Sequence, residues 1–214
     1  MKFSLHFTNL TFPDANDAKR MVLAAEASGF ESVICPEHVV WPIGYESTYP
    51  YSPNGKLPGG QRSKAPDPLI WMSFLGGITQ SLRFISGVLF LPQRNPLVLA
   101  KEVATLDHLT DGRVTLWIGI GWLKEEFEAI GVPFAARGRR TDEYIAAMRE
   151  LWTQDEASFA GDFVRFDRVV CNPKPANGAV PIIIDGHSKA AAKRAGRLGD
   201  GFFRPRARRL RCNR

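Results

Sequence analysis

The sequence predicts an α/β protein in which helices pack outside a parallel sheet. Stretches with strand and helix periodicity alternate along most of the 214 residues, which is the order of a parallel sheet with helical crossovers. Residues 114–118 form an apolar run without polar alternation, as expected of a strand buried on both faces. Gly119 and Gly121 follow this run, and glycine at a strand end lets the backbone approach a ligand closely.

The first half of the chain supplies three predicted strands and two predicted helices. Residues 14–28 carry apolar side chains at helical spacing, and Gly29 supplies the stop. Residues 37–65 form a loop rich in Pro, Gly and Tyr, and loops of this length are usually functional or disordered. We expect a second helix at residues 68–79 and strands at residues 2–7, 32–35 and 83–89.

The second half continues the alternation and adds a hairpin. Asn95 can cap free amides and Pro96 fits the first helical turn, so a helix begins there and ends at Gly112. Residues 157–170 contain a turn sequence and are expected to form a two-stranded excursion. Further helices are expected at residues 137–152 and 188–199, and further strands at residues 180–184 and 201–203.

The composition is that of an ordinary soluble globular domain, with 44% hydrophobic and 23% charged residues. No apolar run is long enough to cross a bilayer, so we expect no membrane partner. Cys35, Cys171 and Cys212 are odd in number and lack metal-ligand spacing. Free thiols in a reducing cytoplasm are therefore expected.

The formal net charge of +6 comes from basic residues at the C-terminal end of the chain. Six of the 28 basic residues are arginines in residues 204–214, and the rest of the chain carries 22 basic against 22 acidic residues. This basic tail has no aromatic residues between its arginines, so it carries little information about a specific nucleic-acid partner. We therefore expect no specific nucleic-acid binding.

Two other classes of chemistry lack their motifs. No His-x-His or His-Glu-x-x-His spacing occurs, which disfavours a catalytic metal. No Gly-x-Gly-x-x-Gly follows the first strand, which disfavours a dinucleotide-binding Rossmann fold. His108 on a helix and Arg113 after it are interpreted as structural residues.

Short motifs occur along the chain in an ordered set from residue 1 to about residue 203. The set comprises Pro36-Glu37-His38, Pro66-Asp67-Pro68, Ser86-Gly87-Val88, residues 89–122, residues 137–144 and residues 198–202. It resembles the bacterial luciferase-like superfamily, specifically its branch of oxidoreductases that use the deazaflavin coenzyme F-420. The resemblance implies a (β/α)8 barrel.

Six predicted barrel strands fall short of the eight strands and roughly 250 residues of a (β/α)8 barrel. One interpretation is a smaller open sheet that ends naturally. We favour an incomplete barrel, with a truncated family domain over residues 1–203 and a basic non-family tail over residues 204–214, because the resemblance stops where the charge begins. Open sheet edges are an aggregation liability, and a homodimer could cover part of that surface.

The carboxyl ends of parallel strands form the ligand site of such folds. His38 is the predicted proton-transfer residue, because imidazole titrates near neutrality and the resemblance places this histidine beside the cofactor ring. Trp41 would line the substrate side or fill the core. Glu37 either orients His38 or is a solvated loop acid, and we favour the second. Arg94 could reach a phosphate.

The resemblance also assigns cofactor contacts. It implies a non-proline cis peptide within Ser86-Gly87-Val88 that backs the central ring, although a plain bulge also fits a glycine inside a strand. Gly186, His187 and Ser188 form a strand-to-helix turn whose free amides could bind the cofactor phosphate, or Ser188 is simply a cap and His187 is exposed. The remaining predicted cofactor contacts are Gly119, Gly121 and Trp122.

Three functions follow from these observations. The first is hydride transfer between F-420 and a small organic substrate, with the cofactor carrying the redox chemistry. The second is an FMN-dependent monooxygenase of the same superfamily, supplied with reduced flavin by a partner reductase. The third is an inactive remnant that binds no cofactor because the barrel is open.

Overall fold

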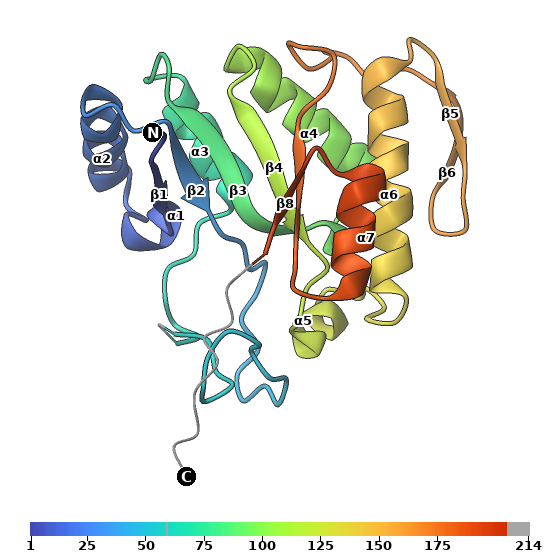
Figure 1. Ribbon diagram of the computed structural model, residues 1–214, viewed down its shortest axis with the longest axis horizontal. Coiled ribbons are helices and arrows are strands. Elements are labelled where there is room, and N and C mark those ends of the chain that lie inside the picture. Colours follow the sequence, from blue (N-terminus) through green and yellow to red (C-terminus); the bar gives the residue numbers. More distant parts are fainter. Residues whose placement is uncertain (59, 205–214) are drawn as a thin grey trace.

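A computed structural model describes residues 1–58 and 60–204, and its centre is one sheet of six parallel strands (Figure 1). The strands lie in chain order, and every neighbouring pair is parallel. This confirms the predicted six-stranded incomplete barrel. The strands are β1 (Ser4–His6), β2 (Ser32–Cys35), β3 (Arg83–Phe90), β4 (Val114–Gly119), β7 (Ile182–Asp185) and β8 (Gly201–Phe203).

Five longer helices form one layer outside the sheet, each packed against the next along the chain. They are α2 (Ala15–Ala27), α3 (Pro68–Gly76), α4 (Pro96–Leu109), α6 (Arg137–Thr153) and α7 (Lys189–Leu198). The predicted hairpin is present as β5 (Ala157–Ala160) and β6 (Arg165–Val169), which are antiparallel and lie against α6 (Figure 1).

Three short elements that the sequence patterns did not indicate each begin within five residues of the end of a strand. They are α1 (Thr8–Thr11) after β1, the 3-10 turn η1 (Leu91–Gln93) after β3, and α5 (Lys124–Ala129) after β4. All three therefore lie at the carboxyl-end edge of the sheet. The long loop between β2 and α3 extends from the same edge (Figure 1).

The core fills the space between the sheet and the helix layer. β4 is buried at every position, as its unbroken apolar run predicted. Phe84 of β3, Leu99 of α4 and Trp152 of α6 are almost completely buried. The Trp152 indole N–H donates to the Ala100 carbonyl at 3.0 Å, so this large side chain has a polar partner inside the core.

The predicted cap at Asn95 is confirmed, and Ser188, for which capping was one of two interpretations, also caps its helix. The Asn95 side chain accepts hydrogen bonds from the backbone N–H groups of Leu97 and Val98, at 2.9 and 3.2 Å. Ser188 accepts from the Ala191 N–H at 3.1 Å. These bonds satisfy N–H groups that a helix start leaves unpaired.

Some sequence expectations fall outside the described residues. The basic tail is described only at Arg204, and Cys212 lies beyond it. Cys35 and Cys171 are buried free thiols. Within residues 1–58 and 60–204, no helix combines the length and apolar character that a membrane crossing needs.

Arg113 is a structural charge, as interpreted from the sequence. Its guanidinium donates to the carbonyl oxygens of Thr110, Leu82 and Gly76 at 2.7–2.9 Å, and to the Thr79 hydroxyl at 2.9 Å. One side chain thus joins the end of α4 to the connection between α3 and β3. Burial lowers the pKa of Arg113.

Replacing this arginine by an apolar side chain of similar length should weaken the fold. We expect Arg113→Met to lower the free energy of unfolding by about 2–4 kcal/mol, because several acceptors lose a charged donor. Urea unfolding measures this. The matched control is Arg139→Met, whose ion pair with Asp162 is mostly exposed and should contribute less than about 1 kcal/mol. Equal losses in the two variants would contradict the assigned role.

Candidate active site

The carboxyl ends of the strands and the long loop enclose a cavity of about 630 Å³. It is lined mainly by aromatic and aliphatic side chains. The strand ends bring together predicted site residues that are far apart in sequence. The predicted residues that line this cavity are His38, Trp41, Gly87, Val88, Gly119, Gly121, Trp122, Gly186, His187 and Ser188.

Ser86 is the one predicted contact that does not line the cavity. It is fully buried inside the sheet, where its hydroxyl bonds to both the N–H and the carbonyl of Trp117 at 3.1 Å. Its side chain therefore ties β3 to β4. Gly87 and Val88 of the same motif do line the cavity.

His38 lies among aromatic rings just after β2. Its ring centroid is 3.8 Å from that of Trp41, 5.2 Å from Phe90 and 6.0 Å from Trp122. Only 9% of the His38 side chain is exposed. The ring is thus held in a narrow apolar setting with one edge on the cavity.

Glu126 is a site residue that sequence reasoning missed. This fully buried acid in the first turn of α5 places Oε2 3.0 Å from Nδ1 of His38. Its other oxygen, Oε1, accepts from the N–H groups of Val39 and Val40 at 2.7 and 3.3 Å. An acid after a glycine-rich strand end was visible in the sequence, but nothing there pairs it with a histidine 88 positions away.

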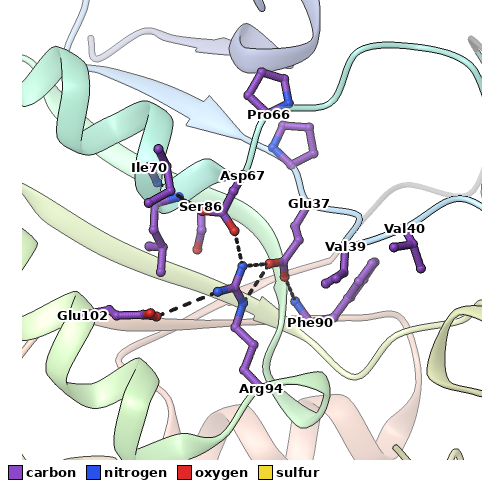
Figure 2. A network of polar contacts seen from close by, with 12 residues as sticks. Glu37, Val39, Val40, Pro66, Asp67, Ile70, Ser86, Phe90, Arg94 and Glu102 are labelled. Atoms are coloured by element: carbon purple, nitrogen blue, oxygen red, sulfur yellow. Dashed lines mark hydrogen bonds and ion pairs between the residues drawn. The ribbon is translucent and has the colours of Figure 1, made fainter. Parts of the chain in front are cut away.

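Glu37 is a buried anchor, so the favoured interpretation as a solvated loop acid was wrong. Figure 2 shows its carboxylate between Phe90 and Arg94. It accepts from the Phe90 N–H at 2.8 Å and from Arg94 Nε at 2.8 Å. Burial raises the pKa of Glu37, and the Arg94 guanidinium opposes this shift. The error arose because the groups that bind Glu37 lie 53 and 57 positions away in the chain.

Arg94 is fully engaged inside the protein and does not face the cavity, so the suggested phosphate contact was also wrong. Besides Glu37, its guanidinium contacts Asp67 at 2.5 Å and Glu102 at 3.9 Å (Figure 2). Asp67 in turn caps α3 through the N–H groups of Leu69 and Ile70. The network thus joins the end of β2, the end of the long loop, η1 and α4.

The strand β3 contains both features that the sequence left open. The peptide bond between Gly87 and Val88 is cis, and the register with β4 shifts between Gly87 and Leu89. A Cβ atom on Gly87 would lie 2.2 Å from Ile34 Cγ2 and 2.9 Å from Trp117 Cε3, so glycine is required here. His6, which sequence reasoning also missed, places Nε2 3.2 Å from the Gly87 carbonyl.

The β7–α7 turn forms the opposite wall. Asp185 bonds to the Trp117 indole at 3.3 Å and to the Tyr51 hydroxyl at 3.4 Å, and burial raises the pKa of Asp185. His187 is exposed and its ring lies 5.8 Å from that of Tyr51. The N-terminal end of α7 opens onto the cavity. Its nearly buried Arg194 also lines the cavity while bonding to Asp142 and the Gly138 carbonyl.

The long loop covers the cavity with aromatic side chains. Tyr45 and Tyr49 both meet the Trp122 ring edge-on, at 5.5 and 5.1 Å. Glu125 of α5 anchors the loop by accepting from the N–H groups of Glu46 and Ser47 and from the Ser47 hydroxyl. Although desolvation acts to raise it, these bonds lower the pKa of Glu125 to about 2.

These residues fit a flat, conjugated cofactor. The walls are aromatic, and the glycines at the ends of β3 and β4 leave the backbone close to the cavity. The Trp41 indole N–H is buried and has no hydrogen-bond partner in the described part of the chain, so it can donate to a ligand. The N-terminal end of α7 offers amides to an anion.

Comparisons with known proteins agree with this architecture. A family model for luciferase-like monooxygenase matches residues 3–205. An uncharacterized protein of Mycobacterium tuberculosis is 37% identical over 180 residues, which are 84% of this chain and 62% of the relative. An FMNH2-dependent dimethylsulfone monooxygenase of Pseudomonas putida is 41% identical over 129 residues, which are 58% of this chain and 35% of that enzyme.

Solved structures share the fold. The monooxygenase RslO1 from Streptomyces bottropensis superimposes with a TM-score of 0.76 at 25% identity, covering 94% of this chain and 59% of its own. An F420-dependent secondary alcohol dehydrogenase in complex with an F420-acetone adduct gives 0.75 at 24% identity, covering 95% and 57%. The chain thus spans 35–62% of the length of these proteins.

The burial of the Glu37–Arg94 pair predicts how the free energy of unfolding changes with pH when Arg94 is replaced. Arg94→Met leaves the Glu37 charge buried without its cation, which should cost about 3–5 kcal/mol near neutral pH. Because the folded-state pKa of Glu37 is raised, the Glu37 carboxyl binds a proton more tightly in the folded protein than in the unfolded chain. The contribution of Glu37 to the free energy of unfolding therefore falls as pH rises. Removing Arg94 should make this loss of stability with rising pH larger.

Urea unfolding at pH 5 and pH 8 tests this expectation. The cost of Arg94→Met should be larger at pH 8. In the Glu37→Gln background, the cost of Arg94→Met should lose most of this pH dependence. A cost that is equal at both pH values in the wild-type background would contradict the assigned pairing.

Proposed function

The chain belongs to the luciferase-like monooxygenase family, and on that premise we propose that it transfers a hydride between coenzyme F-420 and a carbon of a small organic substrate. The family comprises flavin- and deazaflavin-type oxidoreductases. The observation that carries the proposal is His38, an imidazole in an apolar cavity, backed by a buried carboxylate and in close ring contact with Trp41. Hydride transfer at an alcohol or carbonyl carbon needs such a group to hold the oxygen's proton.

The chain would hold the cofactor through groups already placed by the fold. F-420 would supply the hydride donor or acceptor when bound. Gly87, Val88 and Gly119 present backbone to one side of the cavity, and the β7–α7 turn offers free amides to a phosphate. Aromatic side chains of the long loop exclude water from the region around His38.

The protein's own contribution to the chemistry is proton transfer. In the direction of oxidation, bound F-420 would supply the acceptor for the hydride lost from the substrate carbon. His38 would take the proton of the substrate hydroxyl, so that a carbonyl is left. In the reverse direction, protonated His38 returns the proton to the oxygen. The unpartnered Trp41 N–H can donate to the same oxygen. Such proton transfer typically contributes about 10²- to 10⁴-fold to the rate.

An FMN-dependent monooxygenase is the second candidate. It is favoured by the identity of 41% to an enzyme described as FMNH2-dependent. In this case the same cavity would hold FMN, and a separate reductase would supply reduced flavin. The details of the sequence motifs favour F-420 instead, and cofactor binding distinguishes the two.

Titration of the protein with F-420 and with FMN tests cofactor choice. We expect a perturbed F-420 absorbance spectrum and tighter binding of F-420 than of FMN. Tighter FMN binding would favour the monooxygenase. Binding of neither would favour the inactive remnant that the open sheet suggests.

His38→Ala tests the proton-transfer role. Turnover of F-420 with a panel of small aldehydes, ketones and secondary alcohols should fall by about 10²- to 10⁴-fold. The F-420 dissociation constant should change only a few-fold, because a residue acting in the transition state contributes little to ground-state binding. The control is His108→Ala, an exposed position on α4. Unchanged turnover in His38→Ala would remove this residue from catalysis.

A further inference from the structure

The contact between His38 and Glu126 goes beyond placing an acid near a base, because one carboxylate binds both the imidazole and the peptide that follows it. Glu126 Oε2 faces Nδ1 of His38, whereas Oε1 binds the N–H groups of Val39 and Val40. The side chain is fully buried. The two oxygens therefore have different, fixed partners and cannot exchange by rotation without breaking three bonds.

The donor and acceptor roles in this arrangement follow from simple counting. A backbone N–H can only donate, so Oε1 must accept. An ionised carboxylate has no donor, so Oε2 must also accept, and the hydrogen must sit on Nδ1 of His38. Neutral imidazole carries one N–H, so Nε2 holds the lone pair.

We propose that Glu126 is a positioning residue that holds neutral His38 as the Nδ1–H tautomer, so that Nε2 is the proton-accepting atom. This inference rests on the proposed function only for its catalytic consequence. The tautomer itself is a property of the protein without any ligand. The described residues that line the cavity include His38 but not Glu126, so the effect of Glu126 on turnover would act through His38.

A glutamine at position 126 should reverse the tautomer. In Glu126→Gln, the side-chain oxygen should stay with the Val39 and Val40 N–H groups, because only an acceptor can satisfy them. The amide NH2 then takes the place of Oε2 and donates toward His38. Nδ1 must become the acceptor, and the hydrogen moves to Nε2, the wrong nitrogen for accepting a substrate proton.

Glu125→Gln is the matched control. Glu125 precedes Glu126 in α5 and also binds backbone N–H groups of the long loop. Its contacts are with Glu46 and Ser47, not with His38. The control removes a neighbouring carboxylate by the same chemical change and should leave the His38 tautomer as it is.

Nitrogen NMR of the ¹⁵N-histidine-labelled protein without cofactor tests the proposal, with His38→Ala used to assign the signal. At a pH where His38 is neutral, we expect a protonated Nδ1 and an unprotonated Nε2 in the wild-type protein and in Glu125→Gln. Glu126→Gln should show the opposite pair. If Glu126→Gln does not fold, Glu126→Asp, which keeps an acceptor-only group, should retain the wild-type tautomer. A wild-type protein protonated at Nε2, or an unchanged tautomer in folded Glu126→Gln, would overturn the proposal.

Turnover separates this inference from the proposed function. If both hold, Glu126→Gln should lower turnover by about 10²- to 10⁴-fold, the range for a lost acid–base group, with F-420 affinity within a few-fold of wild type. A reversed tautomer together with unchanged turnover in His38→Ala would leave the positioning role intact and refute the catalytic role. An unreversed tautomer together with inactive His38→Ala would do the opposite.

Discussion

Parallel strand pairing is the constraint on which the rest of this structure depends. Parallel neighbours cannot be joined by a tight hairpin, so each connection must cross back over the sheet, and here each one uses helices packed on the same side. All six strands therefore end at one edge. That edge is where the long loop, α5 and the β7–α7 turn meet, and there residues as distant as His38 and Ser188 share one cavity.

Two buried carboxylates stabilise this edge in different ways. Glu37 is compensated by Arg94, and their network ties the end of β2 to η1 and to the N-terminal cap of α3. Within residues 1–58 and 60–204, Glu126 pairs with no Lys or Arg, and it is stabilised by backbone N–H groups and the imidazole of His38. Glu37 fixes where the backbone of the His38 segment lies, whereas Glu126 fixes how the His38 ring presents its nitrogens.

The cavity combines a rigid floor with a covering loop that is tethered at a few points. Gly87 cannot accept a side chain, and Ser86 and Trp117 lock β3 to β4 beneath it. The loop is held by the carboxylates of Glu125 and Glu126, by the ion pair of Lys64 with Asp14, and by the hydrogen bond from Tyr51 to Asp185. A floor set by backbone geometry suits a flat cofactor. A loop held by a few polar contacts suits the selection of a substrate, because it can vary without disturbing the sheet.

The sequence by itself determined the strands, the longer helices and the edge of the sheet on which the candidate site lies. Some features depend on interactions within a few residues or on a simple burial pattern, so they could be predicted from the sequence. These are the strand–helix alternation, the Asn95 cap and the apolar run of β4. Family resemblance added His38 and the cis bond at Gly87. What only the tertiary structure decided was the electrostatics. The roles of Glu37 and Arg94 were predicted wrongly, and Glu126 was missed. The energy of a charged side chain depends on its burial and on its partners, which here lie 53 to 88 positions away in the chain.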